Sequence, residues 1–438
     1  MPATTTQPKP STSASASSSS QLAILGGPKT VESVDADLFK WPIVTEEDEK
    51  AVIDVLRAGT MSQTNISKQF EGEWGQFIGT KFNLCHPNGT ASLLGAFFGV
   101  GLGRGDELIS PSLTYWATAM PCMALGATPV FADIEKDSIC IDPADIERRI
   151  TKRTKAIVVV HYSGHPCDMD AIMAIAKKHN LKVIEDVSHA HGARYKGKMT
   201  GNIGDVACFS MMASKSFPIG EGGMLSTNDR TIYERALAFG HYERMGELTL
   251  PDLRPLAGAP LGGVKHRINQ TASAMGRVQL KHYPQRIKDI QAGMNRFWDL
   301  LEGCPGIRPH RVPANGDSTM GGWYNPLGHY LPEELGGLPV AKFVEAVNAE
   351  GGKTGRTANK PLHVHPALNM PDVYRDGKPT RIAFADRDVR QGPGSLPVSE
   401  ALAERIFGIP WFKKDKPEQI ERFALAYRKV AENAKKLM

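Results

Sequence analysis

The stretch that decides the fold of this chain is Val183-Ile-Glu-Asp-Val-Ser-His-Ala-His-Gly192. Val183 and Ile184 are apolar and β-branched and follow a helical pattern, which predicts a buried parallel strand. This strand would carry Glu185 and Asp186 to its carboxyl end. Because open α/β sheets bind their ligands at that edge, we expect Asp186 to lie at a binding site.

A second stretch, Phe209 to Gly223, follows closely and supplies a lysine. Cys208 to Met211 is predicted to form another strand, and Lys215 lies in a loop closed by Gly220-Glu-Gly-Gly223. A strand-borne carboxylate and a loop lysine are the pair that pyridoxal phosphate requires. That cofactor withdraws electrons while its ring nitrogen is protonated, and it rests as an imine with a lysine.

In this interpretation Asp186 holds the ring proton and Lys215 forms the imine. Each residue also has an ordinary explanation. An Asp at the end of a buried strand often caps the next helix or binds a ribose hydroxyl, and most lysines are solvated.

Strand and helix patterns alternate along the first two thirds of the chain, which predicts a mainly parallel sheet with helices on both faces. The expected strands are 82–85, 107–110, 129–133, 156–161, 182–187, 208–211 and 224–227, and the expected helices are 45–57, 91–100, 114–125, 142–150, 168–179 and 229–239.

The turn Pro87-Asn-Gly-Thr90 comes between a predicted strand and a predicted helix. Free N–H groups and the positive end of the helix dipole suit a phosphate, so Gly89, Thr90 and Ala91 are phosphate candidates. The alternative is an ordinary turn with a Thr cap. After the next strand, Tyr115 or Trp116 either lies against a planar cofactor or packs in the core.

The chain is predicted to consist of three parts. Residues 1–20 are rich in Ser, Thr and Pro and are expected to be a disordered tail, residues 21–295 a large domain with an N-terminal arm, and residues 296–438 a small domain. A long helix from Asn269 to Leu301, interrupted near Pro284, is expected to join the two domains. Helices are also expected at 341–350, 401–407 and 417–435.

Composition excludes several functional classes. The 438 residues are 41% apolar and carry a net charge of +5, without a basic stripe that would indicate nucleic acid. The six cysteines form no Cys-x-x-Cys pair, and two nearby histidines, His161 and His165, lack a third ligand, so neither a disulfide framework nor a metal site is predicted. There is no signal-peptide or membrane-spanning pattern, and the cytoplasm is expected.

Taken together, these motifs resemble the DegT/StrS-type sugar aminotransferases. The similarity rests on Asn88-Gly-Thr-Ala91, Gly105 to Tyr115, Gly126 to Phe131, Ile184 to Gly192, Gly204 to Ser210, Lys215, Gly220 to Gly223, Arg267 to Leu280, Pro361-Leu-His363 and Leu396 to Glu400. It implies an α/β fold-type I transferase, with a mainly parallel, seven-stranded type of sheet in the large domain and a smaller C-terminal α/β domain.

The resemblance also implies roles for individual residues. Lys215 and Asp186 would be catalytic and bind pyridoxal 5'-phosphate, and the other implied cofactor contacts are Gly89, Thr90, Ala91, Tyr115, Ser188, His189, Ser210 and Lys265. Lys265 replaces an Asn that usually reaches the phosphate of the neighbouring subunit, so a homodimer with shared sites is implied. Met212 and Lys360 also depart from the common pattern.

The implied reaction moves an amino group from glutamate or glutamine to a keto sugar or an inosose. His161, Arg267, His363, Trp323 and Tyr324 are candidate substrate contacts. Aromatizing amino-group synthases share every motif, whereas related dehydratases replace the lysine. A catalytically silent sensor stays open, and a nicotinamide enzyme is disfavoured because no Gly-x-Gly-x-x-Gly follows a strand.

Overall fold

The computed structural model describes residues 21–313, 316–355, 359–370, 375, 384–385 and 387–438. The tail predicted for residues 1–20 lies outside the described residues.

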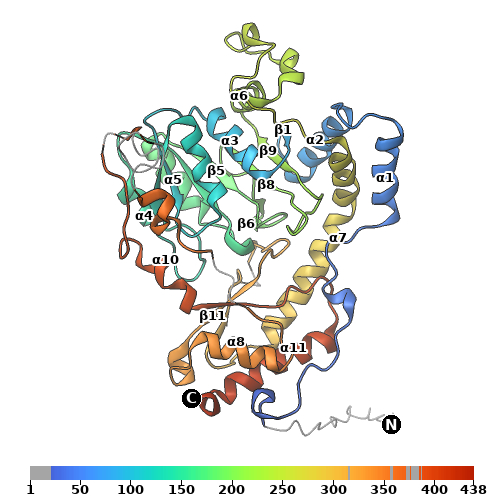
Figure 1. Ribbon diagram of the computed structural model, residues 1–438, viewed down its shortest axis with the longest axis vertical. Helices are drawn as coiled ribbons and strands as arrows, with labels where there is room; N and C mark the ends of the chain where they lie inside the picture. Colours follow the sequence, from blue (N-terminus) through green and yellow to red (C-terminus); the bar gives the residue numbers. More distant parts are fainter. Residues whose placement is uncertain (1–20, 314–315, 356–358, 371–374, 376–383, 386) are drawn as a thin grey trace, which may run out of the picture.

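A seven-stranded sheet forms the centre of the larger part of the molecule (Figure 1). The strand order is β1, β9, β8, β5, β4, β2, β3, and every neighbouring pair is parallel except the two pairs that β9 makes. The predicted mainly parallel sheet is therefore confirmed. The strands are β1 Phe82–His86, β2 Glu107–Pro111, β3 Thr128–Ala132, β4 Thr154–Val160, β5 Lys182–Asp186, β8 Val206–Ser210 and β9 Gly223–Thr227.

Strand β5 lies between β4 and β8, in the middle of the sheet. Its side chains alternate between the two faces, so Val183 packs in one hydrophobic cluster and Ile184 in another. Both residues have no exposed surface. A strand covered on both faces needs apolar residues at consecutive positions, which explains the run that the sequence carries here.

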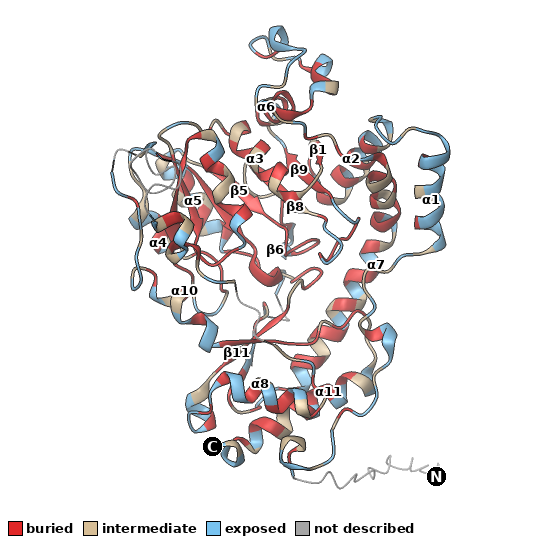
Figure 2. Ribbon diagram, viewed as in Figure 1, coloured by how far each residue is buried: buried red, intermediate tan, exposed pale blue. Residues whose placement is uncertain are grey.

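Helices cover both faces of this sheet, and Figure 2 shows the strands buried between them. The α-helices of this region are α1 Glu46–Arg57, α2 Asn65–Ile78, α3 Gly89–Gly99, α4 Pro143–Arg149, α5 Met169–His179 and α6 Arg230–Gly240. The short 3-10 helices of this region are η3 Trp116–Thr118, η4 Met120–Leu125, η5 Tyr162–Gly164, η6 Tyr242–Glu247 and η7 Arg254–Leu256, and β6 Arg194–Tyr195 pairs with β7 Lys198–Met199. Two more, η1 Ala23–Leu25 and η2 Ala36–Leu38, pack against the C-terminal part of the chain.

The predicted helix 114–125 is wrong in detail, because the structure has η3 and η4 there instead. Pro121 lies in the first turn of η4 and has no N–H to donate to the carbonyl of Ala117, so one continuous α-helix cannot run through it. Instead η3 ends and η4 begins at Ala119.

The long helix α7, Gln270–Leu300, joins the large sheet to a second, smaller layer (Figure 1). The interruption predicted near Pro284 does not occur, because α7 continues through this residue. A proline inside a helix costs about 3 kcal/mol. Packing against α1 and α2 along one part of α7, and against α11 along another, offsets that cost.

The smaller layer is a three-stranded antiparallel sheet in the order β10, β11, β12 with α8 and α11 nearby. Its elements, with those connecting it, are β10 Ile307–Pro309, β11 Leu327–Tyr330, η8 Pro332–Leu335, α8 Val340–Ala349, η9 Leu362–Val364, α9 Pro366–Asn369, α10 Pro397–Ala401, η11 Leu402–Glu404, β12 Ile406–Gly408, α11 Pro417–Glu432 and η12 Ala434–Leu437. The helix predicted at 401–407 is wrong over most of its length, because α10 ends at Ala401, η11 follows, and Ile406 and Phe407 pair with β11 as a strand.

Candidate active site

A cavity of about 470 Å³ opens where three parallel strands end. Val160, Asp186 and Ser210, the last residues of β4, β5 and β8, line it. Tyr324 and Asn359, from the chain beyond α7, line it as well. The cavity therefore lies between the large sheet and segments of the C-terminal part, at the edge where the sequence predicts a binding site.

The start of α3 forms one wall of this cavity through Asn88, Gly89 and Thr90. The side chain of Asn88 caps the helix by accepting a hydrogen bond from the Ala91 N–H at 2.8 Å, so Thr90 is not the cap. A Cβ on Gly89 would lie 2.7 Å from the Cβ of Ser210. The start of α3 therefore packs closely against the end of β8. Because Asn88, Gly89 and Thr90 line the cavity, the N-terminus of α3 lies at its wall, where it suits an anionic group.

The carboxylate of Asp186 is fixed by a chain of hydroxyl groups. Its Oδ2 atom accepts a hydrogen bond from Thr118 Oγ1 at 2.7 Å, and its Oδ1 atom accepts one from the Ser188 N–H at 3.1 Å. Thr118 Oγ1 lies 2.8 Å from Thr114 Oγ1. Because an ionised carboxylate only accepts, Thr118 donates to Asp186 and accepts from Thr114.

Lys215 is 9% exposed, and its amine faces the ring of Tyr324, with Nζ 4.1 Å from the ring centroid. Burial lowers the pKa of Lys215 from 10.5 to about 8, and the negative charge of Asp186 partly opposes this. The backbone of Lys215 is held by the indole of Trp41, which donates to Lys215 O at 2.9 Å. An amine with this pKa exchanges protons readily near neutral pH.

Ser188 and His189 also line the cavity, together with Asp186 and Lys215. Burial, followed by the nearby charge of Lys215, holds the pKa of His189 well below its ordinary value, so the imidazole is neutral. Its Nδ1 atom accepts from the Ser163 N–H at 3.4 Å. Ser188 Oγ accepts from the Ser210 N–H at 3.0 Å and so joins the ends of β5 and β8.

Of the predicted cofactor contacts, Gly89, Thr90, Tyr115, Asp186, Ser188, His189, Ser210 and Lys215 line this cavity. Ala91 is outside the lining, and its N–H is occupied by Asn88. Lys265 is exposed and also lies outside the lining. In the sequence it follows η6 and η7, and the segment that contains these two helices projects from the body beyond α6 (Figure 1).

The predicted substrate contacts His161, Arg267 and His363 do not line the cavity. His161 is buried, donates to Glu185 at 3.0 Å and accepts from the Cys167 N–H at 3.1 Å. Arg267 lies 5.8 Å from the centre of the Tyr242 ring.

His363 is buried between two polar partners. Its Nε2 atom donates to Glu400 at 3.0 Å, and its Nδ1 atom lies 2.7 Å from the hydroxyl of Ser112. These contacts join the end of β2 to α10, so His363 connects two segments of the fold.

Sequence reasoning missed several groups at the cavity, namely Asn88, Thr114, Thr118, Glu221, Asn325 and Asn359. Thr114 and Thr118 carry one usable signal, because they are four residues apart just after a predicted strand. Asn325 and Asn359 carry no comparable local signal, since the fold brings them to the sheet from the C-terminal part.

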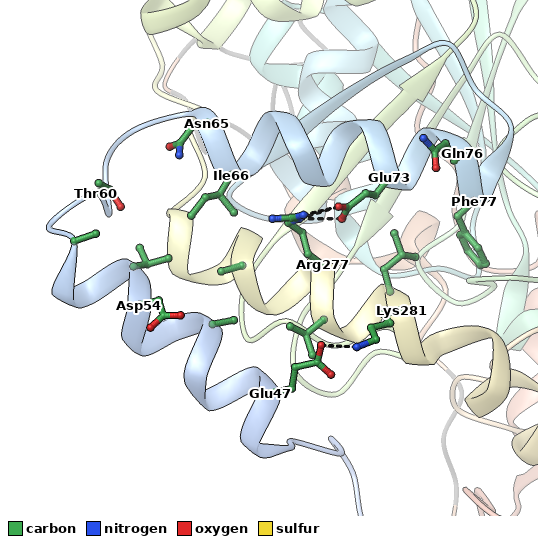
Figure 3. Close-up of a pocket in the computed structure, with 16 residues that line it drawn as sticks. Glu47, Asp54, Thr60, Asn65, Ile66, Glu73, Gln76, Phe77, Arg277 and Lys281 are labelled. Atoms are coloured by element: carbon green, nitrogen blue, oxygen red, sulfur yellow. Dashed lines mark hydrogen bonds and ion pairs between the residues drawn. The ribbon is translucent and has the colours of Figure 1, made fainter.

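A larger cleft of about 1010 Å³ lies between α1, α2 and α7 (Figure 3). Apolar side chains form much of its wall, and charged side chains at it pair with each other, as Arg277 does with Glu73 and Lys281 with Glu47, both at 2.7 Å. By contrast, the cavity at the sheet edge is lined by a buried amine, Lys215, and a buried carboxylate, Asp186.

Two other kinds of feature are missing from the described part of the chain. Among the described residues, no group of three or more His, Cys, Asp or Glu side chains is arranged to hold a metal ion. Within the same residues, no helix is both long and apolar enough to cross a membrane.

Comparison with known proteins identifies the family. Residues 42–427 match the model of the DegT/DnrJ/EryC1/StrS aminotransferase family. The chain therefore belongs to this family of aminotransferases, as the motifs around Asp186 and Lys215 predicted.

Individual relatives agree with this membership. The chain is 32% identical over 377 residues to the spore coat polysaccharide biosynthesis protein SpsC of Bacillus subtilis, covering 84% of this chain and 93% of the relative. It is 30% identical over 444 residues to the L-glutamine:scyllo-inosose aminotransferase of Streptomyces griseus, covering 95% and 99%. The solved structure of DesI in the presence of its TDP-sugar product has a TM-score of 0.77 at 26% identity, covering 95% and 98%.

Proposed function

We propose that this protein is a pyridoxal-phosphate-dependent aminotransferase that moves an amino group from glutamate or glutamine to a keto sugar or a keto-cyclitol. The observation that carries the proposal is the meeting of the Lys215 amine, the Asp186 carboxylate and the start of α3 in one cavity. The similarity to the inosose aminotransferase over 99% of that protein's length supports the substrate class.

The residues of the cavity fit this cofactor. The N–H groups at the start of α3 and the hydroxyl of Ser210 would hold the phosphate, and Gly89 lets these two groups lie close together because it carries no side chain to separate α3 from Ser210. Asp186 would accept a hydrogen bond from the protonated pyridine nitrogen and so keep the proton on the ring, and Tyr115, which is 51% exposed, would cover one face of the ring. Bound there and linked to Lys215, pyridoxal phosphate would supply an electron-withdrawing ring.

Lys215 would act twice in each half of the reaction. Displaced by the amino donor, its Nζ atom would take the proton from the donor's α-carbon as a general base and pass it to the cofactor as a general acid. A pKa of about 8 suits both directions, because both forms of the amine are present near neutral pH. In the second half the Nζ atom of Lys215 would make the same proton transfers in reverse order, this time for the keto acceptor.

Asp186 must keep one orientation during these proton transfers. The hydroxyl of Thr118 and the N–H of Ser188 hold one oxygen each, at 2.7 Å and 3.1 Å. The carboxylate therefore needs little reorganisation when charge develops in the ring, and preorganised groups of this kind contribute strongly to catalysis.

We also propose that the protein acts as a homodimer with shared sites. The segment carrying η6 and η7 projects from the body, and its Tyr242, Leu256 and Leu261 side chains are more than 40% exposed. Contact with a second copy would cover these side chains and would bring Lys265 to the partner's phosphate site, where its ammonium suits an anion. A cytoplasmic location fits the six cysteines, which are all free thiols.

An amino-transfer assay with defined substrates tests the proposal. The purified protein, supplied with pyridoxal phosphate, is incubated with ¹⁵N-amino-labelled glutamate or glutamine, and the acceptor is either scyllo-inosose or a nucleotide-linked 4-keto sugar. Mass spectrometry should find the label in one aminated acceptor and none with Lys215→Ala. Failure of both acceptors, with either donor, would count against the proposed substrate class.

A further inference from the structure

The loop between β10 and β11 places one aromatic side chain against the reactive lysine. Trp323 and Asn325, the residues on either side of Tyr324, have φ angles of 52° each. Positive φ is uncommon for residues other than glycine and is strained for a bulky residue such as Trp. Such conformations persist only where the surroundings impose them, and they gather at functional sites.

The surroundings impose this conformation through several contacts. The indole of Trp411 donates to Gly322 O at 3.0 Å, and the Gly322 N–H donates to His191 O at 3.0 Å. A Cβ on Gly322 would lie 2.4 Å from the Cβ of Ser216, so the loop passes directly against the residue that follows Lys215.

The result of these contacts is a defined position for the Tyr324 ring. The ring of Trp411 meets it edge-on at 5.8 Å, and the ring of His189 lies 4.7 Å away. The Lys215 Nζ atom lies 4.1 Å from its centroid, within the range of a cation–π contact.

We propose that Tyr324 is a further catalytic residue, whose ring face holds the Lys215 side chain as an ammonium whenever the amine is not bonded to the cofactor. This inference rests on the proposed role of Lys215 and assigns a group that the proposed reaction does not itself require.

The ring acts against the effect of burial. Removing the amine from water disfavours its charged form, whereas the electron-rich face of an aromatic ring favours that form. Together, these two opposing effects leave the Lys215 amine able to donate a proton as well as to accept one. Tyr324 belongs to the chain beyond α7. The placement of the C-terminal part against the sheet would therefore determine how far the ring offsets the effect of burial on the pKa of Lys215.

The test compares Tyr324→Leu, which removes the ring, with Tyr324→Phe, which keeps the ring and removes the hydroxyl. The reactivity of Lys215 toward acetic anhydride is measured from pH 6 to 11 on the full-length chain without added cofactor, by mass mapping of the Lys215 peptide. The Leu variant should lower the pKa of Lys215 by roughly one pH unit, and the Phe variant should leave it unchanged.

The proposal would be overturned if Lys215 kept its wild-type pKa in the Tyr324→Leu variant. It would also be overturned if Tyr324→Phe lowered the pKa of Lys215 as far as Tyr324→Leu does. If the Leu variant does not fold, Tyr324→Met, which fills the space with a flexible apolar chain, takes its place. The labelling requires no turnover, so a failure of this proposal can be told apart from a failure of the proposed function in the amino-transfer assay.

Discussion

Replacing Lys215 with methionine should stabilise the cofactor-free protein at neutral pH. Lys215 is 9% exposed, and burial lowers the pKa of its amine from 10.5 to about 8. Folding at pH 7 therefore takes a charged group out of water without full compensation from a partner. Methionine fills a similar volume and carries no charge, so it removes this cost while it also removes the proposed chemistry.

The size of the effect follows from the pKa. At 1.36 kcal/mol for each pH unit, the fall from 10.5 to about 8 corresponds to about 3 kcal/mol of destabilisation. The whole cost is present below pH 8. Between pH 8 and 10.5 the unfolded chain holds a proton that the native chain has lost, so the stability of the wild type rises with pH. The advantage of the Met variant should therefore disappear across this window.

Urea unfolding at pH 7, 8, 9 and 10, followed by fluorescence, measures the difference between the two proteins. Lys215→Arg is the matched control, because its guanidinium stays charged throughout this range. The Arg variant should be less stable than the Met variant at every pH. A Met variant that is no more stable than the wild type at pH 7, or an advantage that does not change with pH, would refute the reasoning.

Three further substitutions test other parts of the site and its support. Thr118→Val removes the hydroxyl that donates to Asp186 at 2.7 Å, and the loss of about 1.5–3 kcal/mol should lower kcat/KM roughly 10- to 150-fold in steady-state kinetics. Gly89→Ala places a methyl group against the end of β8, and we expect at least a tenfold weaker affinity for pyridoxal phosphate by fluorescence titration. Arg244→Met leaves the buried Glu71 carboxylate without its partner at 2.8 Å and should cost about 3–5 kcal/mol in urea unfolding.

Each of these substitutions has a matched control. Thr114→Val removes a hydroxyl one step further from the carboxylate and should lower kcat/KM less than the Thr118 variant does. Gly103→Ala meets no atom within 4 Å and should leave cofactor affinity unchanged. Lys50→Met breaks an exposed ion pair with Asp54 and should change stability by less than about 1 kcal/mol. If a control variant loses as much activity, cofactor affinity or stability as the variant with which it is paired, or more, that result contradicts the corresponding argument.

The sequence predicts the parts of this molecule that local patterns determine. The apolar, β-branched pair Val183 and Ile184 predicts β5, and the order of the strand and helix patterns around it predicts the sheet. Because parallel strands end at one edge, the strand pattern alone is sufficient to place Asp186 at the cavity. The family is confirmed by a match that covers residues 42–427.

The errors arise where tertiary contacts override local preference. Pro284 is a strong local signal for a helix end, yet α7 continues because α1, α2 and α11 pack along it. Phe407 fits a helical pattern, yet β11 provides a strand partner. Asn325 and Asn359, which no local sequence pattern singles out, reach the cavity from beyond α7. No spacing along the chain shows which of the many polar and aromatic residues in that region would do so.

The role proposed for Lys215 is tested most simply by borohydride reduction of the purified protein with pyridoxal phosphate, followed by peptide mass mapping. We expect a pyridoxyl group on the peptide that contains Lys215, and its loss when glutamate or glutamine is added before the reduction. Attachment to a different lysine, or a label on Lys215 that no amino donor removes, would contradict the proposal that Lys215 carries the cofactor for amino transfer.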